Sequence, residues 1–427
     1  MRRRNKHLAR NAVQNAVILL LIANALFLIF CTGLVRPDSF DRVLRTVSSP
    51  AGDQTGDAPS AALPLHVAVR SGGQCRVWMN ETTDGDLFED LGSLLIEALG
   101  SAQDGAAVSE AEFRRALEND AVYYDFTVSL PLRILTGWIG STETDFQHSA
   151  RALLLSGLQS DTLTLYAWDG ASGSYYRWST AIPSGDLLTN TDKYTGSAAE
   201  FAFLCDAPYD TLAPYTFVFS DRLVLADLSA SAALDESAKS SIMTALDFNI
   251  HSSSSYYTES NGAEVISQGS RTLRFSPDGS VAYSGGAEDV PLLQLEQSGE
   301  TPTLAECSSA ALNAANTLTG GRLGSAALYL SSAEADQRGN ATVAFDYTVN
   351  GYPVVFPNRH AVEITIENGV ITSISIQMRT YTALETTTAL MPALQATAAL
   401  PADAPAELFP GYYDDGGDAL QPCWLYQ

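Results

Sequence analysis

The 427 residues of the chain, 46% of them hydrophobic, are enough for two or three packed domains and exclude a chain that is disordered throughout. The net charge is −25 and is unevenly spread, because eight of the 24 basic residues but only two of the 49 acidic residues lie in the first 45 positions. The remainder carries about −31, which excludes binding to nucleic acid or to an anionic lipid surface through charge.

The N-terminus has the pattern of a signal anchor. An apolar stretch without charged side chains, residues 16–35, follows a group of basic residues: Arg2, Arg3, Arg4, Lys6 and Arg10. About 20 apolar residues can cross a bilayer as a helix, and basic residues before a first span keep that end in the cytoplasm. We therefore expect a single-pass protein of the cell membrane, with a cytoplasmic N-terminus and extracytoplasmic domains.

A cleaved signal peptide is the competing interpretation. Such a peptide has an apolar core of about 7–15 residues that ends in small residues, whereas the stretch here is longer and continues through Phe27 to Phe30. Cys31 would suit lipid attachment, but Phe30 stands where a bacterial lipoprotein signal has a small residue. Both observations favour an uncleaved anchor.

One polar residue, Asn24, lies near the centre of the predicted span. Interhelical hydrogen bonds contribute about 0.6–2 kcal/mol in membranes, where an amide without a partner is costly. We expect Ala16, Ala23 and Asn24 to present a small, polar face to a second helix. The alternative is that a single Asn is tolerated in an otherwise apolar anchor.

The folded part is predicted to be α+β, with helices packed on antiparallel sheets. In chain order the expected parts are a cytoplasmic tail (1–11), a transmembrane helix (12–35), a flexible linker (36–62), an N-terminal extracytoplasmic α+β domain (63–225), a middle helix-plus-hairpin domain (226–300) and a C-terminal α+β domain (301–427). Pro, Gly, Ser and Asp dominate the end of the linker, which has no apolar period.

Local signals place several elements. Apolar residues at helical spacing predict a helix over residues 87–98 that ends at Gly100. Thr303 and Glu306 form a capping box before a helix whose apolar face includes Cys307, which is therefore expected in the core. Four turn signals flanked by alternating apolar residues predict hairpins: Asn261-Gly262, Pro277-Asp278-Gly279, Asn350-Gly351 and Asn368-Gly369.

Residues that carry chemistry are sparse. The chain has no Gly-rich phosphate loop, no zinc-binding His-Glu-x-x-His and no nucleophile elbow. The exported histidines, among them His66 and His148, are isolated from one another, and His148 is expected on a helix near Phe146, solvated or capped. We assign no catalytic residue, metal site or cofactor and expect a non-enzymatic protein.

Two polar groups and the cysteines have alternative interpretations. Asp414, Asp415 and Asp418 do not have the spacing of a calcium loop and are expected in a solvated turn. Arg359 and His360 precede a strand and either bind an anion or, as we favour, cap a sheet edge. The exported cysteines either form up to two disulfides or are core residues; they are Cys75, Cys205, Cys307 and Cys423.

Several segments resemble the YycH/YycI family of Gram-positive bacteria. They are residues 246–284, with YYTESNGAEVIS and LRFSPDGSVAYS, and residues 343–378, with FDYTVNGYPVVF and VEITIENGVITSISIQM. The closing LFPGYYDDGGDALQPCWLYQ, with its Pro-x-Trp pattern, is similar to the end of such proteins. The resemblance covers roughly residues 230–427 and the anchor, and these motifs are turn and strand patterns rather than chemical signatures.

The resemblance implies regulation rather than catalysis. Members of the family are membrane-anchored accessory proteins that associate with the sensor histidine kinase of a two-component system governing cell-wall metabolism. It implies two partners, the membrane sensor histidine kinase and a related accessory protein, besides the lipid bilayer, and no nucleic acid.

Two other classes of function stay open. An extracytoplasmic binding protein for a peptide or cell-wall fragment would use exposed aromatic residues such as Tyr256, Tyr257, Trp168 or Trp178. A hydrolase would need paired carboxylates, which the sequence alone does not bring together.

Overall fold

The structure is a computed structural model that describes residues 64–79, 85–138, 146–157, 161–187, 196–249, 255–285, 302–336, 338–400 and 405–426. All described residues belong to one compact unit, within residues 57–427. The predicted tail, span and linker lie outside the described residues. No helix within the described ranges is both long and apolar enough to cross a membrane. For these ranges the predicted α+β class is confirmed, since helices accompany mostly antiparallel sheets.

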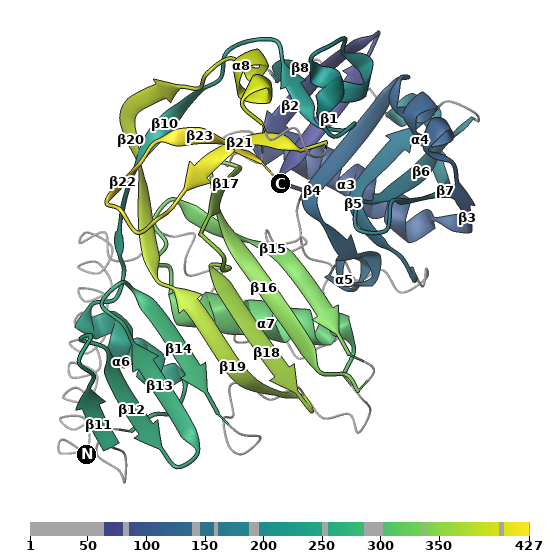
Figure 1. Ribbon diagram of the computed structural model, residues 1–427. Helices are drawn as coiled ribbons and strands as arrows, with labels where there is room; N and C mark the ends of the chain where they lie inside the picture. The colour runs from purple at the N-terminus through teal and green to yellow at the C-terminus, as the bar shows by residue number, and fades with distance from the viewer. Residues whose placement is uncertain are drawn as a thin grey trace, which may run out of the picture. The chain divides into compact units, whose positions relative to one another are not determined.

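A nine-stranded antiparallel sheet is formed by the first half of the described chain (Figure 1). Its strands run in the order β3-β7-β6-β5-β4-β1-β2-β8-β9, so β3 and β9 are the edges. In chain order they are β1 (His66–Ser71), β2 (Gln74–Met79), β3 (Gln103–Val108), β4 (Ala121–Pro131), β5 (Ser149–Ser156), β6 (Thr162–Asp169), β7 (Ser174–Pro183), β8 (Ser197–Phe201) and β9 (Phe217–Phe219). Short 3-10 helices flank β8 at Ser184–Asp186, Ala202–Leu204 and Tyr209–Thr211.

Three helices accompany this sheet: α3 (Gly85–Ser101), α4 (Glu110–Leu117) and α5 (Leu132–Trp138). The predicted helix over residues 87–98 is α3, but the prediction that it ends at Gly100 is wrong, because Gly100 lies inside its last turn. The chain passes into β3 after Ala102 alone, so no left-handed glycine is used to end this helix. α4 begins at Ser109, whose side chain accepts a hydrogen bond from the Glu112 backbone N–H (3.2 Å).

An eleven-stranded sheet contains most of the remaining strands, in the order β11-β12-β13-β14-β19-β18-β16-β17-β21-β23 with β15 paired to β16. The strands are β11 (Ser255–Thr258), β12 (Glu264–Gln268), β13 (Arg271–Phe275), β14 (Ser280–Ser284), β15 (Ala326–Ala335), β16 (Ala341–Val349), β17 (Tyr352–Val355), β18 (Val362–Glu367), β19 (Val370–Gln377), β21 (Leu408–Tyr413) and β23 (Pro422–Tyr426). The β17–β21 pair is parallel and the others are antiparallel. The β14–β19 pair joins strands from residues 226–300 and 301–427 in one sheet.

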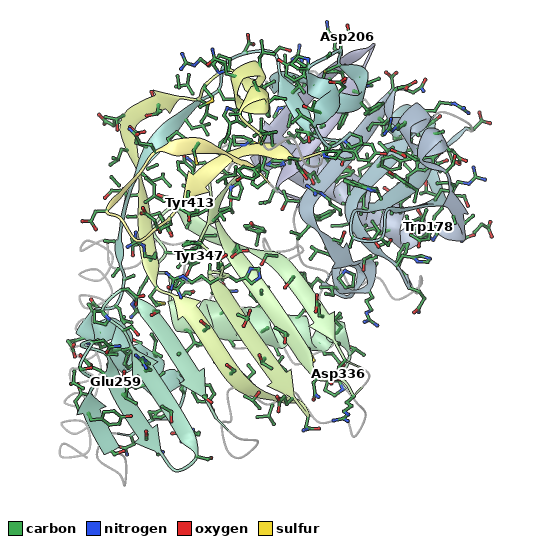
Figure 2. The ribbon with its side chains drawn as sticks, viewed as in Figure 1. Trp178, Asp206, Glu259, Asp336, Tyr347 and Tyr413 are labelled. Carbon is green, nitrogen blue, oxygen red and sulfur yellow. The ribbon has the colours of Figure 1, made fainter. Side chains whose placement is uncertain are left out.

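The four predicted hairpin turns are confirmed. They connect β11 to β12, β13 to β14, β16 to β17 and β18 to β19. Asn350 and Gly351 have φ angles of 52° and 79°, and Asn368 and Gly369 have 52° and 76°, as a two-residue type I′ turn requires. At the first turn, the N–H of Glu259, labelled in Figure 2, donates to the Ala263 carbonyl (2.8 Å).

Helix α7 (Leu304–Thr319) covers one face of the larger sheet, where it packs against β15, β16 and β18 (Figure 1). Its predicted capping box is confirmed: the Thr303 N–H donates to Glu306 Oε2 (2.7 Å), and the Glu306 N–H donates to Thr303 Oγ1 (3.2 Å). Cys307 is fully buried, as predicted, and a left-handed Gly320 ends the helix. Helix α6 (Glu236–Ala245) contacts α7.

A three-stranded sheet and the C-terminal segment complete the fold. β10 (Val224–Ala232) lies between β20 (Arg379–Ala389) and β22 (Ala419–Leu420). After β20, α8 (Ala393–Ala398) packs in a small apolar cluster with Leu212, Val218 and Leu408. The Ala213 N–H donates to the Ala406 carbonyl (2.8 Å). The C-terminal segment is therefore fixed to the strands and loops around the nine-stranded sheet.

Candidate functional site

The residues predicted to mediate helix association and membrane topology lie outside the described ranges. These are Ala16, Ala23 and Asn24 for association, and Arg2, Arg3, Arg4, Lys6 and Arg10 for topology. Their roles stay predictions.

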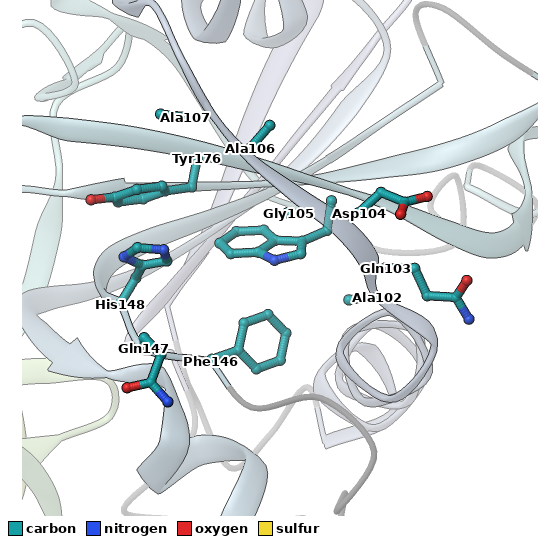
Figure 3. Close-up of a pocket in the computed structure, with 11 residues that line it drawn as sticks. Ala102, Gln103, Asp104, Gly105, Ala106, Ala107, Phe146, Gln147, His148 and Tyr176 are labelled. Atoms are coloured by element: carbon teal, nitrogen blue, oxygen red, sulfur yellow. The ribbon is translucent and has the colours of Figure 1, made fainter.

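Within the described ranges, a pocket of about 440 Å³ lies at the β3 edge of the nine-stranded sheet (Figure 3). This aromatic pocket is lined by Ala102, Gln103, Asp104, Gly105, Ala106, Ala107, Phe146, Gln147, His148, Tyr176 and Trp178. The volume is within the range of small-molecule sites, which are usually apolar hollows with a few polar groups. The hollow is therefore large enough for a small ligand.

Strand β7 contributes two of the rings. Tyr176 and Trp178 are two positions apart in this strand, so they project from the same face of the sheet. The His148 ring stacks on Tyr176, with centroids 3.7 Å apart and planes at 18°, and the two side chains lie together in Figure 3. The Phe146 ring meets Trp178 edge to face, with centroids 5.1 Å apart. The stacking and edge-to-face contacts hold the four rings in fixed orientations.

The prediction that His148 lies on a helix is wrong. His148 belongs to the extended segment that leads into β5, and its carbonyl accepts a hydrogen bond from the Leu132 N–H (3.0 Å). The apolar residues Phe146 and Ala150, which suggested a helical face, instead belong to this segment and to the start of the strand. The extended conformation lets the imidazole stack on Tyr176.

Of the four aromatic residues predicted for ligand binding, Trp178 is the one that lines the aromatic pocket. Trp168 instead lies beneath the Arg151 guanidinium, at 5.4 Å from ring centroid to Cζ, and packs on Tyr215. Tyr256 and Tyr257 project from the edge strand β11 and are 57% and 50% exposed. No pattern in the sequence indicates that Phe146 and His148 lie beside Trp178.

A second polar site is a buried ionic cluster formed by His66, Asp125, Arg151 and Glu407. His66 Nδ1 lies 3.0 Å from Asp125 Oδ2. Arg151 pairs with Glu407, and its Nε lies 3.9 Å from Asp125 Oδ1. The Asp125 carboxylate also accepts a hydrogen bond from the Thr127 N–H (2.8 Å). The strands β1, β4 and β5 thus bring three of these groups to Glu407, which immediately precedes β21.

Burial and charge act on these carboxyl groups in opposite directions. Burial disfavours ionisation of Asp125, but the hydrogen bond from His66 and the charge of Arg151 outweigh it, so the Asp125 pKa is lowered. Burial raises the pKa of Glu407 despite the opposing charge of Arg151. His66 Nε2 is buried and has no hydrogen-bond partner among the described residues. The small cavity beside the cluster is otherwise lined mainly by apolar side chains. The Arg151–Glu407 ion pair links the C-terminal segment to the nine-stranded sheet.

The prediction of a solvated turn is wrong for Asp414. Its side chain is fully buried and accepts hydrogen bonds from Arg379 Nε (3.0 Å) and Nη2 (3.1 Å). The Tyr381 hydroxyl donates to Asp414 Oδ2 (2.7 Å). Asp415 and Asp418 are exposed, as predicted. The sequence pattern around the glycines was that of a surface turn, and the Arg379 partner lies 35 positions away.

Arg359 and His360 lie in the connection between β17 and β18, and both face carboxylates. His360 Nδ1 lies 2.9 Å from Asp346 Oδ2, and Arg359 lies 3.9 Å from Asp278. The hydrogen bond to Asp346 raises the pKa of His360.

The four described cysteines are free thiols, so none of the open disulfide pairings is present. Cys75 and Cys307 are core residues, and burial raises the pKa of Cys75 to about 12. In the part of the chain that is described, no group of three or more His, Cys, Asp or Glu residues is arranged to hold a metal ion.

These features define an α+β protein built on two large, mostly antiparallel sheets, with an aromatic pocket and a buried ionic cluster. No family model matches the chain, and no curated protein matches it by sequence. Among solved structures, the chain is similar to the crystal structure of YycH from Bacillus subtilis, with a TM-score of 0.56 and 12% sequence identity. The match covers 87% of this chain and 95% of the YycH chain. The resemblance to YycH is therefore confirmed at the level of the fold.

Proposed function

We propose that this chain is a non-enzymatic, membrane-anchored regulator of a cell-wall-related two-component histidine kinase. The observation that supports the proposal is the similarity to the YycH fold over 87% of the chain. Regulation is the function that the YycH/YycI resemblance implies. The N-terminal anchor pattern is consistent with it, because the cell membrane is where such a kinase resides.

In the proposed mechanism, the span over residues 12–35 packs beside the transmembrane helices of the kinase, and the extracytoplasmic domains take part in the regulation. A partner shifts an equilibrium only by its differential affinity for the two states. The Asn24 amide would provide such a difference if its hydrogen bond to the kinase helix forms in one state and not in the other. Ala16 and Ala23 would allow the close approach that this hydrogen bond needs.

Replacing Asn24 with leucine is expected to weaken recovery of the kinase severalfold, because the helix pair loses an interhelical hydrogen bond. In the measurement, a crosslinker placed in the predicted span is activated in membranes. The chain is then purified, and the sensor kinases attached to it are identified. Thr32→Leu, another polar-to-leucine change within the predicted span, is the matched control and should leave recovery unchanged. Failure to recover any sensor kinase with the wild-type chain would contradict the proposal, and equal recovery with Asn24→Leu would exclude the role of Asn24.

A second candidate function is an extracytoplasmic binding protein for a cell-wall fragment or peptide. The aromatic pocket favours it, because Trp178 and Tyr176 lie with Phe146 and His148 around a hollow of ligand size. The two functions are compatible, since a regulator with a ligand site on its extracytoplasmic part can respond to that ligand.

A further inference from the structure

The wall of the aromatic pocket that β3 forms departs twice from regular strand geometry. Asp104 has a φ of 55°, in the left-handed region, and the register of β3 against β7 shifts between Gln103 and Ala106. Gly105 lies at this shift, and a Cβ there would collide with the Trp178 indole. β-Bulges are frequent beside functional sites, where they redirect the backbone. The glycine therefore lets the strand pass close to the indole at the pocket wall.

The rings are held in place by their own packing, without a ligand. Phe146 and Trp178 are 2% and 6% exposed and fix each other edge to face. His148 and Tyr176 are partly exposed and stacked. Because side-chain ordering is one of the costs of binding, a pocket whose rings are already ordered binds a ligand more tightly than a flexible one.

The charge of the lining restricts the ligand. The described residues that line the pocket include no Lys or Arg, whereas Asp104 contributes a carboxylate and Gln103 and Gln147 contribute amides. An anionic ligand would meet no cation and would be repelled by Asp104. A sugar ring has an apolar C–H face that suits aromatic side chains and hydroxyl groups that both donate and accept hydrogen bonds. The lining combines amide, carboxylate and imidazole groups with aromatic rings, which is the chemistry that such a ligand needs.

We propose that the aromatic pocket binds one ring of a neutral saccharide. The apolar face of the sugar packs against the partly exposed rings of His148 and Tyr176, beside the buried Trp178 indole. This inference rests on the second candidate function, for which it names the ligand class. It does not involve the kinase, so it stands or falls independently of the proposed regulation.

The test is isothermal titration of the full-length chain in lipid nanodiscs with four trisaccharides. Chitotriose and maltotriose are neutral, trigalacturonate is anionic, and deacetylated chitotriose is cationic. Saturable binding of at least one neutral sugar is expected, with trigalacturonate binding less tightly because it meets the Asp104 carboxylate. Tighter binding of deacetylated chitotriose than of both neutral sugars would overturn the assignment to a neutral ligand. Tyr176→Ala and His148→Ala should each weaken binding about tenfold, because each removes one ring of the stacked pair.

Three further variants make the test specific. Tyr176→Phe keeps the ring and should keep binding within about threefold. Tyr256→Ala removes an exposed tyrosine far from the pocket lining and should have no effect. Gly105→Ala should weaken binding as the indole is displaced. Thermal unfolding of each variant shows that it is folded. The proposal is overturned if no neutral sugar binds, if trigalacturonate binds equally well, or if folded Tyr176→Ala and His148→Ala bind like the wild type.

Discussion

Replacing Arg151 with methionine is expected to lower the free energy of unfolding by about 3–5 kcal/mol at neutral pH. Arg151 is the cation that faces both Glu407 and Asp125 in the buried ionic cluster, so its removal leaves two buried carboxyl groups with His66 as the remaining partner. Methionine keeps most of the apolar stem of the side chain but loses the guanidinium that lies over the Trp168 ring. The measurement is equilibrium unfolding of the full-length chain in detergent by urea.

The decrease in the free energy of unfolding caused by Arg151→Met should depend on pH. Burial already raises the Glu407 pKa, and without Arg151 the charge that opposes this increase is gone. A folded-state pKa above the unfolded value means that the folded state binds the additional proton, so the variant gains stability as the pH falls through that pKa. The difference from wild type should therefore be largest near neutral pH and narrow toward acid pH.

Arg177→Met is the matched control, because Arg177 pairs with Glu112 at 2.7 Å but is 42% exposed. Exposed pairs contribute about 0–1 kcal/mol, so this variant should lose no more than that. Equal losses in the two variants would show that the buried ionic cluster does not hold the C-terminal segment in place.

Replacing Asp414 with alanine is expected to cost about 3–5 kcal/mol, because it leaves the buried Arg379 guanidinium without its carboxylate and the Tyr381 hydroxyl without its acceptor. Arg379 also donates to the carbonyls of Gly416 and Gly417, which retain part of its hydrogen bonding. The free energy of unfolding, measured under the same conditions, reports the loss.

The neighbouring Asp415→Ala is the control, since this exposed side chain accepts one hydrogen bond from Gly417 N–H (3.1 Å) and should change stability by less than about 1 kcal/mol. The double variant Arg379→Met with Asp414→Leu removes both charges and should recover part of the loss. If Asp414→Ala lowers the free energy of unfolding no more than Asp415→Ala does, the buried pair does not stabilise the contact between the start of β20 and the end of β21.

The local signals of the sequence predicted much of the fold. Asn350-Gly351 and Asn368-Gly369 specify their turns because positive φ angles are needed at both central positions, and Thr303 with Glu306 specifies the start of α7. Such features depend on residues within a few positions of one another. The α+β class followed from them.

The sites could not be predicted in the same way. Arg151 and Glu407 are 256 positions apart, and isolated charged residues carry no pairing signal in one sequence. His148 and Tyr176 likewise meet only because the segment before β5 crosses the face of β7. Asp414 was mistaken for a surface residue because its neighbours, Asp415 and Gly416, have the composition of an exposed turn. Pairings between distant segments are set by tertiary packing, which outweighs local composition.

The function proposed for this chain is regulation of a membrane histidine kinase. Its most direct test is the autophosphorylation rate of the sensor kinase recovered by crosslinking, reconstituted in lipid vesicles with and without the full-length chain. A regulator with about tenfold preference for one kinase state shifts the balance of the two states by about 1.4 kcal/mol. A severalfold change in rate is expected with the wild-type chain, and a smaller change with Asn24→Leu. An autophosphorylation rate that is the same with and without the wild-type chain would contradict it.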